Sequence, residues 1–208
     1  MIKENDFVEI EFSAKTKEGV LVDTTKKEEA EKVGLKSEEV KNLKIPVGKG
    51  FLIKGLDKDI IGKEIGKDYE VEIKPEDAFG KRNPSLVKVV PISSFREQNI
   101  FPQKGMQFSF DGLLGKISSV SGGRVLVDFN NPLAGKILIY SYKIIRKIED
   151  KKEQLESLEE FFFKKVFENE ISEDKAKIIV EKNFSPLVKS LKNNFEEILN
   201  LKIEVEER

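Results

Sequence analysis

The side chains that most often carry enzyme chemistry are unevenly represented in this sequence of 208 residues. It contains no His and no Cys, whereas Asp and Glu together number 38 and Lys and Arg together number 37. Catalysis by Ser-His-Asp or Cys-His groups is therefore excluded, as are disulfides and metal sites built on thiolates or imidazoles. Any chemistry must rely on carboxylates, lysines, hydroxyls, or the shape and polarity of a pocket.

Neither the carboxylates nor the glycines form a motif that predicts a reaction. Most acidic residues fall on expected solvent-facing strands and helices, and abundance alone does not make a catalytic pair. Gly48, Gly50 and Gly55 match neither the dinucleotide-binding nor the phosphate-binding glycine pattern. The net charge of −1 predicts no nucleic-acid partner. We therefore expect no cofactor and no metal site.

One internal stretch is poor in charge. Residues 84–131 hold 8 charged side chains in 48 positions, against 36% for the whole chain. Asn83-Pro84 and Asn131-Pro132 bracket the stretch, and Asn-Pro pairs favour turns. We expect an inserted module with a hinge at each end. The alternative is one continuous sheet protein with an apolar middle.

The flanking segments must position any site, and they show strand and helix periodicity. Leu56 and Ile60 lie four residues apart on one face of a short helix expected over residues 54–61. Alternating or clustered apolar residues predict strands at residues 8–12, 20–22, 43–45, 69–73 and 137–148.

The insert and the end of the chain have different patterns. The insert is expected to be all-β, with strands at residues 87–90, 106–110 and 125–129. After residue 150 the spacing predicts a helix through Val166, a second helix from Ser172 to Val180, a third beginning near Pro186, and a closing strand over residues 201–205.

Several segments occur in an order typical of one known family. They include the motifs Gly48-Lys49-Gly50 and Ala78-Phe79-Gly80, and they cover residues 12–24, 47–56, 73–80, 131–136 and 138–140. Together these segments resemble FKBP-type peptidyl-prolyl cis-trans isomerases. The charge-poor stretch follows Ala78-Phe79-Gly80, where the SlyD-like branch carries its insert-in-flap chaperone module. The end of the chain resembles the C-terminal extension of the long archaeal members.

The resemblance implies an α+β fold in which a half-open antiparallel sheet wraps on a short helix and leaves an apolar pocket between them. It implies an isomerase domain over residues 1–83 and 132–149. The insert-in-flap module would be residues 84–131, and a C-terminal α+β extension would be residues 150–208.

Position in the family pattern also implies roles for individual residues. The catalytic set is Asp23, Phe12, Phe79 and Tyr140, and the substrate-binding set is Val22, Leu43, Leu52, Ile53, Leu56 and Leu133. Asp23 would be the charged group at the pocket rim, and the Leu52-Ile53 backbone would dock the main chain of the substrate. From the residues alone, Asp23 could instead be a turn residue that caps nearby backbone amides, and the apolar members could be ordinary core.

Departures from the family pattern leave a second function open. Family members commonly have Tyr where Phe12 and Phe79 stand and Trp where Leu56 stands, although SlyD-like members share the Leu. The first prediction is a peptidyl-prolyl cis-trans isomerase and folding chaperone that acts on X-Pro bonds of unfolded or partly folded proteins. The alternative is a holdase chaperone with a weak or vestigial isomerase pocket.

Apolar residues of the insert could form a surface that binds client proteins, because few charges remain to cover it. A module of this size is marginal alone, so some or all of these side chains could instead fill its own core. The candidates are Val89, Val90, Phe95, Phe101, Phe108, Phe110 and Leu113.

The Phe161-Phe162-Phe163 run is too apolar for a solitary surface helix. It either packs back on the main domain or forms a homodimer interface through residues 150–208. No apolar run approaches the roughly 18 residues of a membrane span, and the first residues have no signal-peptide pattern. We therefore expect a cytoplasmic protein whose partners are unfolded or nascent proline-containing polypeptides, with no membrane association.

Overall fold

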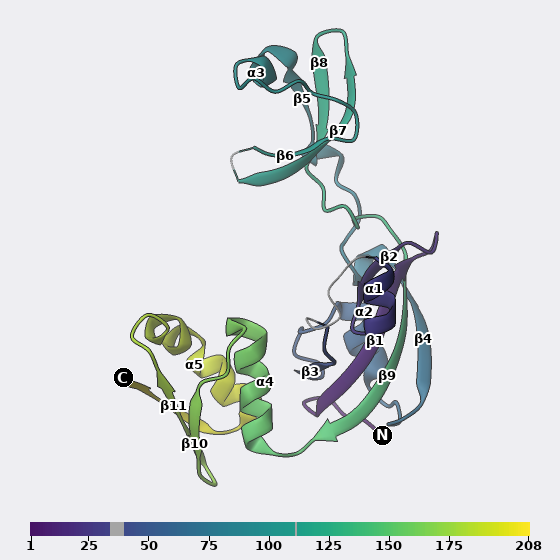
Figure 1. Ribbon diagram of the computed structural model, residues 1–208. Coiled ribbons are helices and arrows are strands. Elements are labelled where there is room, and N and C mark those ends of the chain that lie inside the picture. The colour runs from purple at the N-terminus through teal and green to yellow at the C-terminus, as the bar shows by residue number, and fades with distance from the viewer. Residues whose placement is uncertain (34–39, 111) are drawn as a thin grey trace. The chain divides into compact units, whose positions relative to one another are not determined.

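The computed structural model describes residues 1–33, 40–110 and 112–208. The chain forms two compact units (Figure 1). The first unit joins residues 1–73 to residues 138–208, and the second contains the residues between them. No helix among the described residues is long and apolar enough to cross a membrane.

A five-stranded antiparallel sheet forms the centre of the first unit. The longest strands, β1 and β9, pair along their whole length, while β2 and β3 pair with different halves of the other edge of β1. The predicted α+β class with an antiparallel sheet is therefore confirmed. The strands are β1 (Phe7–Thr16), β2 (Leu21–Thr24), β3 (Leu43–Pro46), β4 (Asp68–Ile73) and β9 (Leu138–Ile148).

Helix α2 (Lys54–Ile60) packs beside β4. Leu56 and Ile60, whose spacing predicted one apolar face, are both fully buried. A Cβ atom at Gly55 would lie 2.4 Å from Cγ2 of Ile73, closer than real Cβ contacts come. Glycine therefore permits the close approach of the helix to the strand. A shorter helix, α1 (Lys27–Lys32), buries Ala30.

Replacing Gly55 by Ala should destabilise the first unit. The added methyl group must displace Ile73 or α2, and overpacking of this kind costs about 1–3 kcal/mol. Urea unfolding, followed by far-UV circular dichroism, measures the loss. In an Ile73→Ala background the two nearest crowding atoms, Cγ2 and Cγ1, are gone, so Gly55→Ala should cost much less. An equal cost in both backgrounds would contradict the steric explanation.

Residues after 150, called here the C-terminal extension, mix helices and strands. They form α4 (Lys151–Phe163), β10 (Glu168–Ile171), β11 (Lys175–Val180), α5 (Ser185–Leu199) and β12 (Lys202–Glu207). The third predicted helix and the closing strand are confirmed as α5 and β12. The predicted helix ending at Val180 is wrong. Ala176, Ile178 and Val180 are buried and alternate with less buried residues, which is the period of a strand.

The core of the C-terminal extension is continuous with the sheet. Phe7 of β1 and Ile148 of β9 belong to the same buried cluster as Leu155, Phe195 and Ile203. The extension and the sheet therefore form one compact unit. Helix α4 of the extension also contacts β3 of the sheet.

The second unit contains a separate four-stranded antiparallel sheet in the order β5-β8-β7-β6. The all-β expectation for the insert omitted α3, which begins directly after Pro91 and turns Phe95 into the core, where it is 3% exposed. The elements are β5 (Val87–Pro91), α3 (Ile92–Arg96), β6 (Gln107–Phe110), β7 (Leu113–Ser121) and β8 (Arg124–Asp128), preceded by 3-10 turns at Pro75–Asp77 and Pro84–Leu86.

The two ends of the inserted stretch lie side by side within the second unit. The backbone N–H of Asn83 donates to Oδ1 of Asn130 at 2.8 Å, and Nδ2 of Asn130 donates back to the Asn83 carbonyl at 3.0 Å. Arg82 forms an ion pair with Asp128 beside them. The chain therefore enters and leaves the strands of the second unit at nearly the same place.

Candidate active site

Four residues line up across the sheet of the first unit. Ala14 on β1 lies opposite both Asp23 on β2 and Tyr140 on β9, and Tyr140 lies opposite Val71 on β4. Directly opposed residues share a face of a sheet, so a carboxylate, a methyl group, a phenol and an aliphatic group stand in one row. Phe12 is two residues before Ala14 on the same face, and its ring centroid is 5.7 Å from that of Tyr140.

Tyr140 provides a hydroxyl that stays protonated at neutral pH. Burial is the main cause and the negative charge of Asp23 adds to it, and together they raise the pKa of Tyr140 to about 12. Among the described residues, none accepts a hydrogen bond from this hydroxyl. The O–H group is therefore available to donate to a ligand.

Asp23 stands at the exposed end of the row. Its Oδ1 accepts the backbone N–H of Thr24 at 2.9 Å, so the carboxylate caps one neighbouring amide within β2. The Thr24 hydroxyl in turn donates to the Phe12 carbonyl at 3.1 Å and accepts the N–H of Lys26 at 3.0 Å. The end of β2 is thus tied to β1, and this fixes the Asp23 backbone while its side chain remains at the surface.

The loop that leads into α2 is held by a residue that the sequence did not single out. Gly48 and Gly50, both with positive φ, donate their backbone N–H groups to Oδ1 and Oδ2 of Asp57 at 2.7 and 3.0 Å. Asp57 is only 6% exposed. The glycines that match no nucleotide motif therefore bind a carboxylate of the protein itself. The signal available in the sequence was an acidic residue a few positions after two closely spaced glycines.

Ile53 and Leu56 occupy the beginning of α2. Ile53 is the N-cap residue, and its carbonyl accepts the N–H groups of Leu56 and Asp57, each at 3.0 Å. The Ile53 N–H itself has no acceptor within the described part of the chain. Leu56 is fully buried. The start of α2 therefore combines an unpaired backbone donor with a buried apolar side chain.

The structure places part of the predicted site in the first unit, where Phe12, Asp23 and Tyr140 share one face of the sheet. Phe12, Asp23, Tyr140 and Leu56 are placed as described above. Three further members are half-buried in the same unit on β2, on β3 and before α2: Val22, Leu43 and Leu52. Phe79, which is 37% exposed, and Leu133 belong to the second unit, so their part in the pocket stays a prediction.

Comparison with known proteins identifies the family. The model of the FKBP-type peptidyl-prolyl cis-trans isomerase family matches residues 1–108, which is more than half of the chain. The chain belongs to this family. The predicted FKBP-type peptidyl-prolyl isomerase is thereby confirmed. A second match, to a family described as "FKBP26, IF domain", covers residues 88–133 of this FKBP-type isomerase.

Curated relatives agree with the family match. The "Short-type peptidyl-prolyl cis-trans isomerase" of Methanocaldococcus jannaschii is 33% identical over 146 residues, which are 69% of this chain and 92% of that protein. The SlyD isomerase of Pasteurella multocida is 30% identical over 158 residues, 74% of this chain and 73% of that protein. The SlyD isomerase of Haemophilus influenzae is 28% identical over 158 residues, 74% of this chain and 76% of that protein.

The apolar candidates in the insert of this FKBP-type isomerase separate into surface and core. Val89, Phe101 and Leu113 are 61%, 76% and 63% exposed. The prediction that Phe95 contacts clients is wrong, because this side chain is buried in the core of the second unit. Two other candidates, Val90 and Phe108, are half-buried against that core. The Phe110 side chain lies outside the described part. Leu114, which the sequence analysis did not select, is 59% exposed.

No group of three or more acidic side chains in the described ranges is placed to hold a metal ion. The polar atoms at the row of Asp23 and Tyr140 are one carboxylate and one phenol. This donor set is suited to hydrogen bonding with a peptide and supplies no bond-making nucleophile.

Proposed function

We propose that the row on the sheet and the start of α2 together form the isomerase pocket for X-Pro bonds of unfolded or partly folded polypeptides. The observation that carries the proposal is the packing of Phe12 on Tyr140 in the row that ends at Asp23. Leu56 would form the base of the pocket, and Val22, Leu43 and Leu52 would contribute apolar walls.

The chemistry suits a protein without His or Cys. Rotation about an X-Pro bond breaks amide resonance and has a barrier of about 18–20 kcal/mol. No covalent bond is made, so neither a nucleophile nor a metal is required by the reaction. The planar amide is more dipolar than the twisted transition state. A dry apolar pocket therefore favours the twisted form, and each 1.36 kcal/mol of difference gives about tenfold in rate.

Two hydrogen-bond donors would orient the substrate in this pocket. The unpaired N–H of Ile53 would bind a main-chain carbonyl of the peptide, and the Tyr140 hydroxyl would bind a second one. In this role Tyr140 would replace the donor that Phe79 lacks. Asp23 would act through its charge on the carbonyl dipole of the twisting bond. No proton is transferred, so Asp23 is not a general base.

The second unit would recruit clients. The supporting observation is that Val89, Phe101, Leu113 and Leu114 are exposed around a small core of their own. This surface exposes apolar side chains and lies in a stretch with few charged residues, as expected for contact with unfolded chains. The division into an isomerase domain, an insert and an extension is part of this proposal. Dimerisation through residues 150–208 also stays a prediction.

Catalysed cis-trans exchange of a short X-Pro peptide tests the isomerase site. Tyr140→Phe should lower kcat/KM by about threefold to tenfold through the loss of one hydrogen bond. Asp23→Ala should lower kcat/KM by about tenfold through the loss of the charge at the pocket rim. Tyr69→Phe is the matched control, because Tyr69 lies on β4 and its hydroxyl accepts the N–H of Glu64 at 2.9 Å; it should leave the rate unchanged.

A different outcome would favour the holdase alternative. If the intact chain exchanges the peptide no faster than buffer does, while it still suppresses aggregation of an unfolded protein, the pocket is vestigial. The observation that keeps this alternative is Phe79, which lacks the hydroxyl common in the family.

A further inference from the structure

The loop between β3 and α2 alternates its contacts between two partners. The backbone N–H groups of Gly48 and Gly50 bind Asp57 of α2. The intervening and following side chains, Lys49 and Phe51, instead reach the C-terminal extension. The loop therefore lies between the helix that begins at the site and a segment more than 100 residues further along the chain.

Phe51 is the main contact on the side of the extension. Its ring centroid is 4.7 Å from that of Phe161 and 5.7 Å from that of Phe162, both at the end of α4. The two α4 rings also meet each other edge to face at 5.3 Å. Lys49 adds an ion pair with Glu197 of α5 at 3.1 Å, whose exposed position makes it weak.

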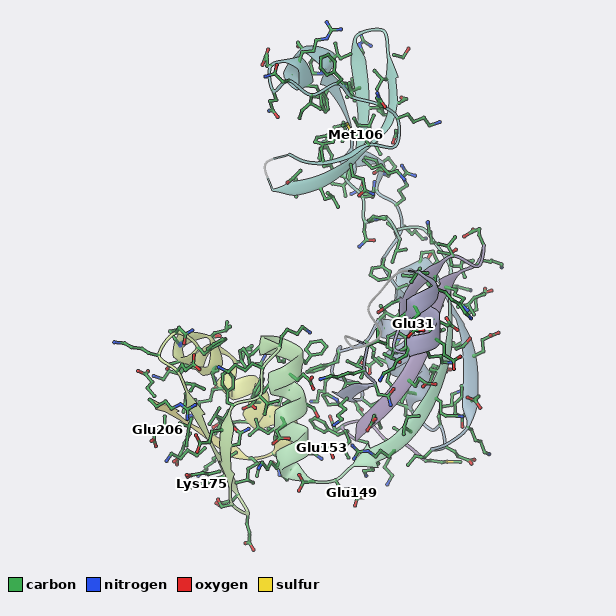
Figure 2. The ribbon with its side chains drawn as sticks, viewed as in Figure 1. Glu31, Met106, Glu149, Glu153, Lys175 and Glu206 are labelled. Atoms are coloured by element: carbon green, nitrogen blue, oxygen red, sulfur yellow. The ribbon has the colours of Figure 1, made fainter. Side chains whose placement is uncertain are left out.

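The other end of α4 is fixed to the sheet by charge. Glu153 pairs with Lys44 of β3 at 2.7 Å and with Arg146 of β9, and Arg146 also donates to Glu9 of β1 at 2.8 Å. Hydrogen bonds from Arg146 and then Lys44 lower the pKa of Glu153 to about 2, so it is ionised at neutral pH. Figure 2 shows Glu153 on α4 beside the strands of the sheet. The helix is therefore held at one end by the sheet, and its other end holds Phe51.

We propose that the C-terminal extension positions the isomerase site, because Phe161 and Phe162 hold Phe51 and so fix the backbone of the residues that follow it. Those residues are Leu52 and Ile53, and the inference rests on the proposed role of the Ile53 N–H in binding substrate. Phe51 is a positioning residue and does not itself touch the reacting bond.

The composition of the loop explains why such a contact is needed. Gly48 and Gly50 lose more conformational freedom on ordering than other residues do. With Phe51 released, the loop would have to be ordered anew each time a substrate binds at Ile53. That cost weakens the binding of ground state and transition state alike. The expected signature is a higher KM with kcat little changed.

The test compares the full chain with Phe51→Ala, Phe161→Ala and the double variant. Each single variant should raise KM for the X-Pro peptide by about threefold to tenfold. The KM of the double variant should rise no further than that of the more affected single variant, because the two substitutions remove the same contact. Amide exchange at Leu56, whose N–H donates to the Ile53 carbonyl at 3.0 Å, should become faster in all three when measured by NMR. Phe51→Leu should restore most of the loss, since an apolar side chain of similar reach remains.

Controls separate positioning from folding of the extension. Leu187→Ala removes an exposed apolar side chain of α5 and should change neither KM nor Leu56 exchange. Exchange at Ile178, in the core of the extension, should stay slow in Phe161→Ala. The inference is wrong if Phe161→Ala leaves KM and Leu56 exchange unchanged, or if the losses of the two single variants multiply. If the intact chain lacks catalysis, the proposed function fails, and Leu56 exchange still decides the positioning role.

Discussion

Replacing residues 84–131 by a short linker is expected to slow proline-limited refolding of a protein client by about 100-fold relative to the intact chain. The kcat/KM of the shortened chain for a short X-Pro peptide should stay within about twofold of the value for the intact chain. A client held on the insert meets the pocket at a raised effective concentration, and a second binding site of this kind typically adds 10²–10⁴ in apparent affinity. A tetrapeptide is too short to bind both sites and gains nothing from the insert.

The architecture makes this deletion practicable. The four strands β5–β8 pair only with one another among the described residues, so their removal exposes no edge of the other sheet. Asn83 is joined by two hydrogen bonds to Asn130, two residues before Pro132, so a few residues can connect Asn83 to Pro132.

A milder variant keeps the insert folded. Val89, Phe101 and Leu113 are exposed, so changing all three to Ser should leave the core around Phe95 intact and still slow client refolding. Changing Val33 and Ile65 to Ser is the matched control, because both are exposed apolar residues of the first unit. Equal refolding rates for the intact and deleted chains would show that the insert recruits no client.

The elements that sequence reasoning predicted well are those fixed by local periodicity. Leu56 and Ile60 marked the buried face of α2, and alternation marked the strands of the sheet. The same reasoning failed at β11. Ser172 to Asp174 resembled a helix cap, but the alternation of Ala176, Ile178 and Val180 decided the structure once β10 and β12 could pair with it. Pairing between separated segments outweighed a local signal.

The parts of the site that the sequence could not predict depend on contacts between distant segments. Composition cannot tell that Phe95 is core and Phe101 is surface, because the difference comes from α3 turning one of them inward. The role of Phe51 depends on helix α4, which begins 100 residues later. Tyr140 was selected from its position in the family pattern, while its unpaired hydroxyl became visible only with the structure.

The buried carboxyl of Glu159 should make the stability of the C-terminal extension depend on pH. Glu159 is fully buried on α4; its Oε2 accepts the N–H of Phe167 at 3.1 Å and Nδ2 of Asn169 at 3.0 Å. Oε1 of Glu159 and Oδ1 of Asn169 have no hydrogen-bond partner. Burial is the largest cause of a pKa raised to about 7, and the nearby charge of Glu156 also raises it.

The sign of the effect follows from this shift. The folded state keeps a proton that the unfolded chain releases between pH 4.5 and about 7, so the free energy of unfolding falls as the pH rises through this interval. The difference between the pKa values of the unfolded and folded states corresponds to about 3 kcal/mol of unfolding free energy, at 1.36 kcal/mol per unit of pKa.

Glu159→Gln isolates this contribution, because the amide does not titrate and its N–H can donate to the unpaired Asn169 oxygen. The free energy of unfolding, from urea titrations followed by circular dichroism, is measured for both chains at about pH 4.5 and about pH 8. Relative to the native chain, the Gln chain should be more stable at about pH 8 than at about pH 4.5, by about 3 kcal/mol. Every other titrating group is common to both chains and cancels. A difference that stays constant between the two pH values would mean that Glu159 titrates alike in the folded and unfolded states, and that water or a structural change relieves its burial.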